Sequence, residues 1–138
     1  MTDQRLIPDS AAMTAAEFRV LRDHLGLTGE WLAEHLQVTL RTVRRWDAGT
    51  SPIPGGVAAT MWELEAESDA FVAAVVEELR ADGPDEDGSA WVTTYASDAA
   101  YRAEHPDLDW PAAWHRAAMG RVVRELDWVR ITYIGETE

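Results

Sequence analysis

The chain has 138 residues, of which 46% are hydrophobic, and a formal net charge of −13 at pH 7. This length corresponds to one domain or to a small domain with a companion, and the apolar content is sufficient for a packed core. The absence of cysteine excludes disulfides and thiolate metal sites, and no apolar run approaches the ~20 residues of a membrane span. We therefore expect a cytoplasmic protein without membrane contact.

The charge is divided unevenly along the chain. Residues 1–54 carry six arginines and seven acidic residues, so residues 55–138 carry the other six arginines and 18 acidic residues, a net charge of −12. Such acidity argues against diffuse binding to polyanions. Three arginines nevertheless lie within five positions in "RTVRRW", residues 41–46. Because salt limits the reach of distant charge to about 8–10 Å, this cluster can still attract an anionic partner.

The first predicted element follows an irregular segment. Residues 1–12 show no apolar periodicity, which predicts a flexible arm. Thr14 and Glu17 have the spacing of a capping box, and Gly26 has the place of a helix stop. The apolar residues between them recur at helical spacing and are Phe18, Leu21 and Leu25.

Two further short helices are predicted next. Thr28 and Thr39 are their expected N-caps, and the third helix covers residues 40–47. The residues expected to face inward are Trp31, Leu32, Ala33, Leu36, Val43 and Trp46. If the third helix buries its apolar pair, it must turn four residues outward, which are Leu40, Arg41, Arg44 and Arg45.

A long helix is predicted over residues 54–81. Its apolar stripe has spacings of three and four and consists of Val57, Met61, Leu64, Phe71 or Val72, Val75 and Leu79. At 1.5 Å per residue this helix would be roughly 40 Å long, which exceeds what the core of a small domain needs. We therefore expect part of the stripe to pack on a second unit or on a partner subunit. The segment "DGPDEDGS" at 82–89 ends the helix.

The last part changes its period. Residues 91–95, "WVTTY", and 128–134, "WVRITYI", are rich in β-branched and aromatic side chains and predict two strands. Between them Asp109 or Trp110 is expected to cap a helix with Pro111 in its first turn, which would make a β-α-β unit. Two strands alone are marginally stable, so the sheet should pack on the long helix or extend across a dimer.

The predicted fold is therefore mainly α with a small α/β C-terminal unit. Residues 98–104 are expected to form an additional helical turn. The expected organisation is a flexible arm at 1–12, a helix-turn-helix domain at 13–53, a long connecting helix at 54–81 and a small α/β dimerisation unit at 90–138.

Helices two and three, "LTGEWLAEHLQVTLRTVRRWDAG", have the pattern of a helix-turn-helix. An outward arginine can donate two hydrogen bonds to guanine O6 and N7 in the major groove, or to a phosphate. The alternative is a merely solvated charged face. Because the cluster coincides with the outward face of the third helix, we favour contact with nucleic acid, and RNA is not distinguished from DNA by this argument.

Residues 13–50 resemble the Cro- and lambda-repressor-like (XRE-type) helix-turn-helix family in the spacing T-x-x-x-L-A-x-x-L-x-V-T-x-x-T-V-x-x-W-[acid]-x-G. The stretches "MTAAEFRVLRDHLGLT", "RTVRRWDAGTSPIP" and "WHRAAMGRVVRELDWVRITYI" resemble, more narrowly, the YdiL-like group that includes autorepressors of anti-CRISPR operons. The resemblance implies a homodimeric, sequence-specific repressor of double-stranded DNA with an inverted-repeat operator. Each recognition helix, 40–47, would enter the major groove.

The resemblance also implies roles for individual residues. Those expected at base edges are Leu40, Arg41 and Arg45, and those expected at phosphates or flanking bases are Thr28, Thr39, Thr42 and Arg44. Arg22 and Asp47 occupy positions that the family often joins as a structural ion pair. Two departures are Gly29, where glutamine is usual, and Gln37, where a turn glycine is common and a left-handed backbone is therefore expected.

Other constellations point to no chemistry. The seven tryptophans are expected to serve core or dimer packing. His24, His35, His105 and His115 lack metal-ligand spacing and a nucleophile, so we expect no enzyme activity, no metal and no cofactor. The alternative function is an antitoxin-like interaction protein that binds a basic protein partner through its acidic C-terminal half and autoregulates its operon.

Overall fold

The computed structural model describes residues 12–136, so the predicted arm lies outside the described residues except for its last position. Six helices and two strands make up this part of the chain, and the fold is mainly helical with a small parallel sheet, as predicted. The helices are α1 (Ala15–Leu25), α2 (Gly29–Leu36), α3 (Leu40–Ala48), α4 (Gly55–Asp82), α5 (Asp98–Glu104) and α6 (Ala112–Glu125), and the strands are β1 (Ala90–Thr94) and β2 (Val129–Tyr133).

The first three helices begin at threonine caps, as predicted. The Thr14 hydroxyl accepts the Glu17 N–H at 3.0 Å, and the Glu17 carboxylate accepts the Thr14 N–H at 2.9 Å, which completes the capping box. Thr28 and Thr39 cap α2 and α3 in the same way. Gln37 ends α2 in the left-handed conformation (φ 60°), and its side-chain amide donates to a carbonyl in the last turn of α2.

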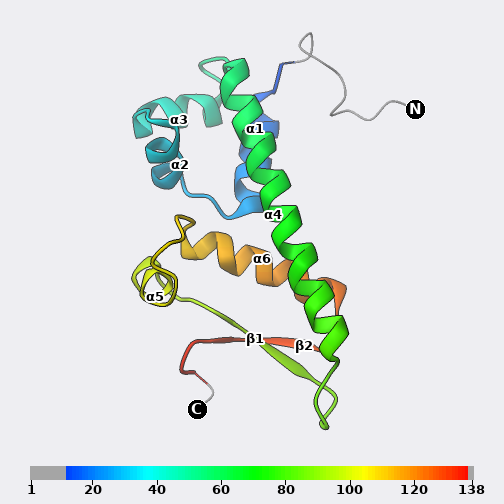
Figure 1. Cartoon of the computed structure of the whole chain (residues 1–138). Coiled ribbons are helices and arrows are strands. Elements are labelled where there is room, and N and C mark those ends of the chain that lie inside the picture. Colours follow the sequence, from blue (N-terminus) through cyan, green and yellow to red (C-terminus); the bar gives the residue numbers. More distant parts are fainter. Residues whose placement is uncertain (1–11, 137–138) are drawn as a thin grey trace, which may run out of the picture.

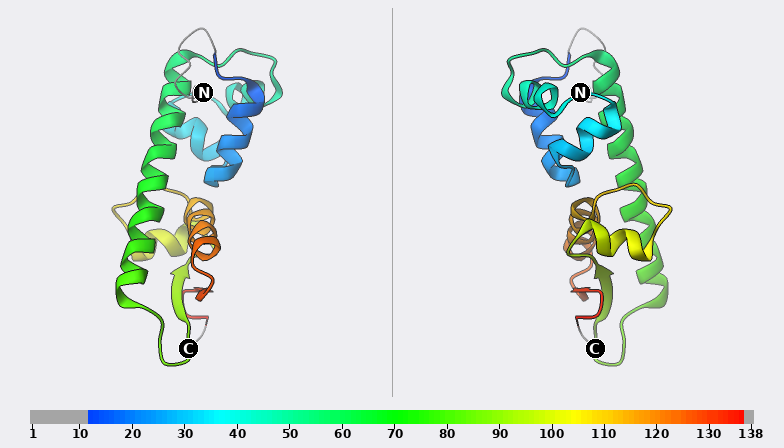
Figure 2. Two further views of the ribbon diagram at one scale, coloured as in Figure 1. Left: turned by 90° about the vertical axis from the view of Figure 1, so that its right-hand side faces the viewer. Right: turned by 90° about the vertical axis from the view of Figure 1, so that its left-hand side faces the viewer.

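Helix α4 extends along the whole molecule and connects its two ends (Figures 1 and 2). It packs on α1 with its first half and on α6 with its second half. The buried residues are Met61, Leu64, Ser68, Val72 and Val76. Phe71, Val75 and Leu79, also predicted to face inward, are half-buried and pack against the buried residues of α4 and α6. A serine occupies the middle of the stripe because its hydroxyl accepts a hydrogen bond from α6.

The two strands pair in parallel, with Ala90 opposite Val129 and Thr94 opposite Tyr133. Helix α6 connects them and packs on the sheet, so the expected β-α-β unit is present. The predicted start of α6 is wrong, because Pro111 is the N-cap in an extended conformation (ψ 158°) and the helix begins at Ala112. Neither Asp109 nor Trp110 caps it. The first free N–H of α6, on Ala112, instead donates to the Asp98 carboxylate of α5 at 2.8 Å.

The buried residues form two clusters that both include α4. The larger one joins α1, α2 and α3 to Met61 and Leu64 of α4 and also reaches Tyr95, Tyr101 and Trp114. The smaller one joins the second half of α4 to α6 and β2. The helix-turn-helix therefore shares its core with the C-terminal half. In the part of the chain that the structure describes, no helix is long and apolar enough to cross a membrane.

Candidate nucleic-acid interface

Helix α3 has one face in the core and the other in solvent. Val43 is fully buried and Trp46 is 5% exposed, with its ring edge-to-face on Phe18 at a centroid distance of 5.8 Å. Arg41, Arg44 and Arg45 are exposed, and Leu40 is half-buried. The orientation predicted from the apolar pair is therefore confirmed. Hydrophobic burial fixes the inner face of α3 against the core, so the helix holds its guanidinium groups toward solvent.

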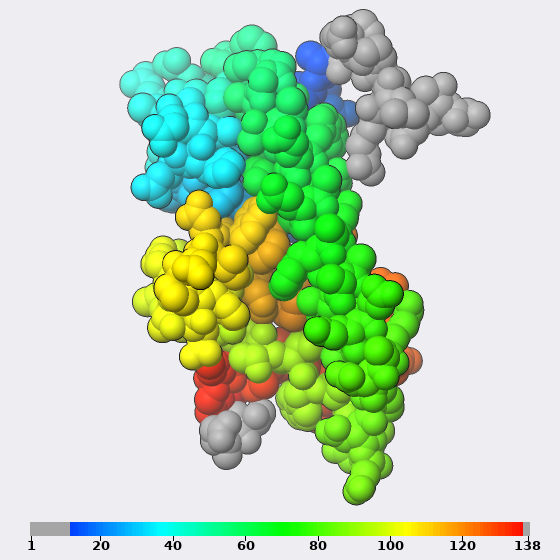
Figure 3. Space-filling view, in the orientation of Figure 1, coloured from blue at the N-terminus to red at the C-terminus, as the bar shows by residue number. Residues whose placement is uncertain are grey.

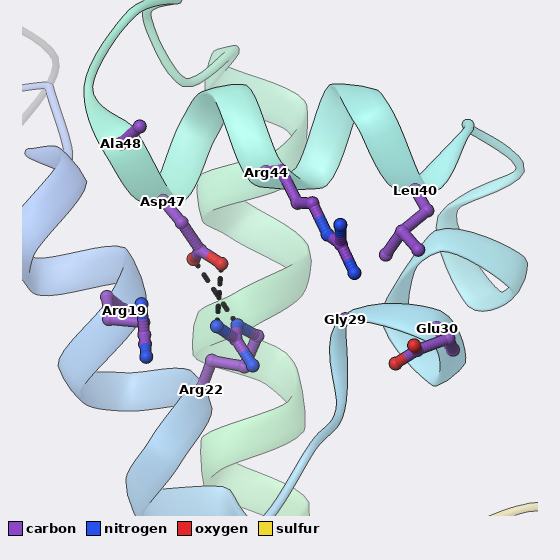
Figure 4. A pocket seen from close by; sticks show the side chains of 8 residues that line it. All are labelled: Arg19, Arg22, Gly29, Glu30, Leu40, Arg44, Asp47 and Ala48. Atoms are coloured by element: carbon purple, nitrogen blue, oxygen red, sulfur yellow. Dashed lines mark hydrogen bonds and ion pairs between the residues drawn. The ribbon is translucent and has the colours of Figure 1, made fainter.

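The outer face of α3 is a ridge between two hollows. Leu40, Arg44 and Ala48 are spaced by four residues and line both hollows, each about 410 Å³ in volume. The hollow toward α1 and α2 is shown in Figure 4 and is also lined by Arg19, Arg22, Gly29, Glu30 and Asp47. The hollow on the other side is also lined by Arg41, Arg45 and Thr50. A projecting helix with a concavity on each side has a shape that can enter a groove.

The three arginines of this ridge lack acidic partners. Among residues 12–136, none of Arg41, Arg44 and Arg45 forms an ion pair, whereas four other arginines do. The acids at the same surface are Glu30, which lines the first hollow, and Asp47, whose charge is already paired. The protein as a whole is acidic, but this face keeps its positive charge available for an anion.

Arg22 and Asp47 form the ion pair that the resemblance implies. Two nitrogens of Arg22 donate to the two carboxylate oxygens of Asp47 at 2.6 and 3.3 Å (Figure 4). The third nitrogen donates to the Leu27 carbonyl at 3.1 Å. The Arg22 residue is only 9% exposed. This two-point contact ties the end of α1 to the end of α3, so it positions the ridge and is not itself available to a ligand.

The hydroxyls at the start of α3 are already engaged. Thr39 accepts the Thr42 N–H at 3.1 Å, and the two threonine hydroxyls share a hydrogen bond of 3.0 Å. Together the pair therefore retains one hydroxyl hydrogen for an outside acceptor. Thr28 accepts the Trp31 N–H at 3.0 Å, which leaves its own hydroxyl hydrogen able to donate. Thr28 and the Thr39–Thr42 pair thus each keep one hydroxyl hydrogen that can be donated to a phosphate oxygen, while Thr28 and Thr39 also cap their helices.

The departure at Gly29 has a packing consequence. A Cβ atom at this position would lie 3.1 Å from Leu40 Cδ1, which is tighter than ordinary contact. The glycine therefore lets Leu40 lie close over the start of α2. Sequence reasoning missed two residues of the same hollow, Arg19 and Glu30. Arg19 lies one turn before Arg22 on α1, and that spacing is the signal that could have placed it here.

The structure places the best-buried histidine of the C-terminal half in a hydrogen bond and not beside any acid that it describes. His115 is buried among aromatic rings, and its Nδ1 lies 2.8 Å from the Thr94 hydroxyl. Burial, with a smaller contribution from the nearby His105, lowers the pKa of His115 to about 4, so the imidazole is neutral at pH 7. Burial also raises the pKa of Tyr101 to about 12. Within the described range no three His, Asp or Glu side chains gather in a way that could hold a metal ion.

The capped α2–α3 pair, with its buried inner face and basic outer ridge, defines a helix-turn-helix protein of the DNA-binding class. The family described as Aca2/YdiL-like matches residues 13–126, and the chain belongs to this family. This is an anti-CRISPR-associated and YdiL group of helix-turn-helix regulators, which are typically not enzymes, and membership implies DNA-binding regulation. No curated protein matches the chain.

Proposed function

We propose that this protein is a sequence-specific transcriptional repressor that binds an inverted-repeat operator as a homodimer and controls, among others, its own promoter. The observation that carries the proposal is the ridge of α3, where buried Val43 and Trp46 force three unpaired arginines outward. In this proposal residues 13–53 bind DNA, residues 54–81 connect, and residues 90–138 hold the subunits together. The two copies of α3 would enter successive major grooves about 34 Å apart.

Each contact on α3 has a proposed task. Arg41 and Arg45 are one helical turn apart and would donate to guanine edges, and Leu40 would provide apolar contact to bases. Arg44 lies on the ridge between the two hollows and would bind a phosphate. Phosphates would also be bound by the hydroxyls that remain available at the helix starts, on Thr28 and on the Thr39–Thr42 pair.

We place the dimer contact at the outer edge of β2. The sheet has two strands among the described residues, so this edge has no paired strand there and leaves backbone donors and acceptors available. Ile131, Tyr133 and Ile134 are 37%, 41% and 44% exposed at this end of the molecule. A hollow of about 210 Å³ beside the edge could take a side chain of the second copy. Antiparallel pairing of two β2 strands across a two-fold axis would complete a four-stranded sheet.

The DNA assignment is tested by selecting bound sequences from a random pool of duplexes with the full chain. We expect an inverted repeat. Replacing Arg41 or Arg45 with alanine should then cost about 1–3 kcal/mol of binding free energy and relax the preference at one base pair of each half-site. Arg124→Ala, which removes an exposed arginine of α6, is the matched control and should leave the binding free energy and the base preference unchanged. Wild-type affinity in both α3 variants would contradict the proposal.

The dimer assignment is tested by sedimentation. Ile131→Arg places a charge on the proposed contact and should give a monomer at concentrations where the wild type is dimeric. Leu108→Arg changes a second exposed apolar residue, 43% exposed, that lies before α6 and outside the sheet, so this variant should remain dimeric. A dimeric Ile131→Arg variant would place the contact elsewhere.

A further inference from the structure

A row of stacked aromatic rings crosses from the helix-turn-helix to the C-terminal half. His35 stacks on Trp31 at a centroid distance of 4.7 Å, and Trp31 faces Trp110 at 5.6 Å, in both cases with 11° between the planes. Trp110 stacks in turn on Trp114 at 4.2 Å and 9°. The first two rings belong to α2, the third precedes α6 and the fourth lies inside α6. Figure 3 shows the corresponding contact between α2 and the segment before α6.

Hydrogen bonds anchor this row at both ends. The Trp31 indole N–H donates to the Asp109 carbonyl at 2.7 Å, which fixes its ring against the segment that carries Trp110. The Trp114 indole N–H donates to the Ser68 hydroxyl of α4 at 2.6 Å, and this contact is buried. The row therefore begins on α2 and ends on α6, where its last ring is hydrogen-bonded to α4.

A second contact holds the helix-turn-helix on α6. A Cβ atom on Gly26, which has φ 71°, would lie 2.4 Å from the Ala113 carbonyl oxygen, so backbone meets backbone at this point. Met61 and Leu64 of α4 provide a third attachment through the shared core. If the helix-turn-helix were attached only to α4, it could rotate about that helix. The contacts at Gly26 and in the row lie away from α4 and oppose this rotation.

The chemistry of the row suits orientation better than simple burial. Trp31 and Trp110 are only half-buried, so they contribute less to the core than Trp114 does. Near-parallel rings held by an indole hydrogen bond resist tilting as well as separation, which aliphatic side chains of similar area do not. These partly exposed rings bridge two parts of the chain, so a change in the angle between the two parts would separate the stacked rings.

We infer that the Trp31–Trp110–Trp114 row fixes the angle between each helix-turn-helix and the dimer unit, and thereby sets the separation of operator half-sites that the protein accepts. This inference rests on the proposed function. Moving a half-site by one base pair shifts it by about 3.4 Å along the duplex and about 35° around it. A protein whose two ridges are held at one angle tolerates such a shift poorly, whereas a hinged protein follows it.

The first experiment measures affinity for operators whose half-site separation is changed in steps of one base pair. The wild type should lose at least about tenfold in affinity two base pairs from its optimum. Trp110→Leu keeps apolar area but removes the ring, so this loss should shrink to about twofold. Trp110→Phe should retain most of the wild-type profile, and Trp62→Leu, which removes a tryptophan outside the row, should retain all of it.

The second experiment tests the same angle without DNA. The chain has no cysteine, so Ala48→Cys and Ala103→Cys, both exposed, allow one spin label on α3 and one on α5. With labelled protein diluted into unlabelled protein, the distance distribution within a chain should be narrow for the wild type and clearly broader for Trp110→Leu. An equally narrow distribution overturns the inference, as does an unchanged spacing profile. A wild type that selects no DNA overturns the proposed function, and the spacing claim with it, while a broadened distribution would still show the row to be a brace.

Discussion

The two halves of the molecule bury their polar groups in different ways. The helix-turn-helix buries a charged pair, Arg22 with Asp47, beside its outer ridge. The C-terminal half buries neutral groups, with the Trp114 indole on the Ser68 hydroxyl and the His115 imidazole beside Thr94. A charged pair gives strong, directional positioning at the cost of desolvation, whereas neutral pairs satisfy donors within a packing unit. The difference teaches that an ion pair adds to the hydrophobic burial that orients the ridge, whereas the buried polar contacts of the acidic half join neutral groups.

The largest expected effect is the loss of stability when the buried ion pair of the helix-turn-helix is broken. Asp47→Ala leaves the buried Arg22 guanidinium without its carboxylate and should lower the free energy of unfolding by about 3 kcal/mol or more. Asp23→Ala removes a partner of Arg19 from a pair whose side chains are 55% and 60% exposed, and should cost less than about 0.5 kcal/mol. Urea denaturation of both variants gives the comparison. Equal midpoints would show that the buried pair has no special weight.

The second effect is a pH dependence of stability that comes from the buried neutral imidazole of His115 in the C-terminal half. Burial lowers the pKa of His115 from its usual 6.5 to about 4, so between these values the unfolded chain binds a proton that the folded chain does not. Stability from this group is therefore present above pH 6.5 and is lost as the pH falls toward 4, by about 3 kcal/mol in total. The difference in unfolding free energy between wild type and His115→Asn should shrink by this amount from pH 7 to pH 4. His24→Asn, which removes an exposed histidine, is the matched control.

A smaller effect is expected at the hydrogen bond between α4 and α6. Ser68→Ala leaves the buried Trp114 N–H without an acceptor and should cost about 1–3 kcal/mol in unfolding free energy. The loss should be independent of pH between 5 and 8, in contrast to that at His115. Ser89→Ala is the control, because its hydroxyl bonds Asp87 in an exposed turn and should change stability by less than about 0.5 kcal/mol. An unaltered Ser68→Ala variant would indicate that the indole finds another acceptor.

The smallest effect is expected for DNA binding when one exposed arginine is removed from each half of the molecule. Arg44→Ala and Arg124→Ala remove the same charge from opposite halves, and both side chains are exposed. On the proposed operator, Arg44→Ala should weaken binding by about 1 kcal/mol for all sequences and reduce the slope of log affinity against log salt by about 1. Arg124→Ala should do neither. Equal slopes for the two variants would remove Arg44 from the phosphate contacts.

Much of the N-terminal half was predictable because its signals are local. Thr14, Thr28 and Thr39 each satisfy donors within three residues, and the spacing of Val43 and Trp46 orients α3 without reference to the rest of the chain. The left-handed Gln37 was instead expected from the family resemblance, because a turn glycine is common at that position. The Arg22–Asp47 pair, which spans 25 residues, was anticipated through the family resemblance and not through any local rule.

The errors in the C-terminal half share one cause. The start of α6 was misplaced because its cap comes from Asp98, 14 residues earlier in the chain. Ser68 was left out of the predicted stripe of α4 because it appears polar in the sequence, but its hydroxyl is hydrogen-bonded to Trp114, 46 residues away. In both cases a distant side chain replaces the partner that a local rule requires.

The sequence by itself determined the order of the elements, the caps of the first three helices, the outward direction of the arginines and the mainly helical class with a parallel β-α-β unit. These features follow from interactions between residues a few positions apart, which operate before the chain is packed. Only the tertiary structure decided that α2 and the segment before α6 meet through stacked tryptophans, that the helix-turn-helix shares its core with the C-terminal half, and which side chains line the hollows beside α3. Such contacts join residues far apart in the chain, and their geometry depends on how α4 places both halves at once.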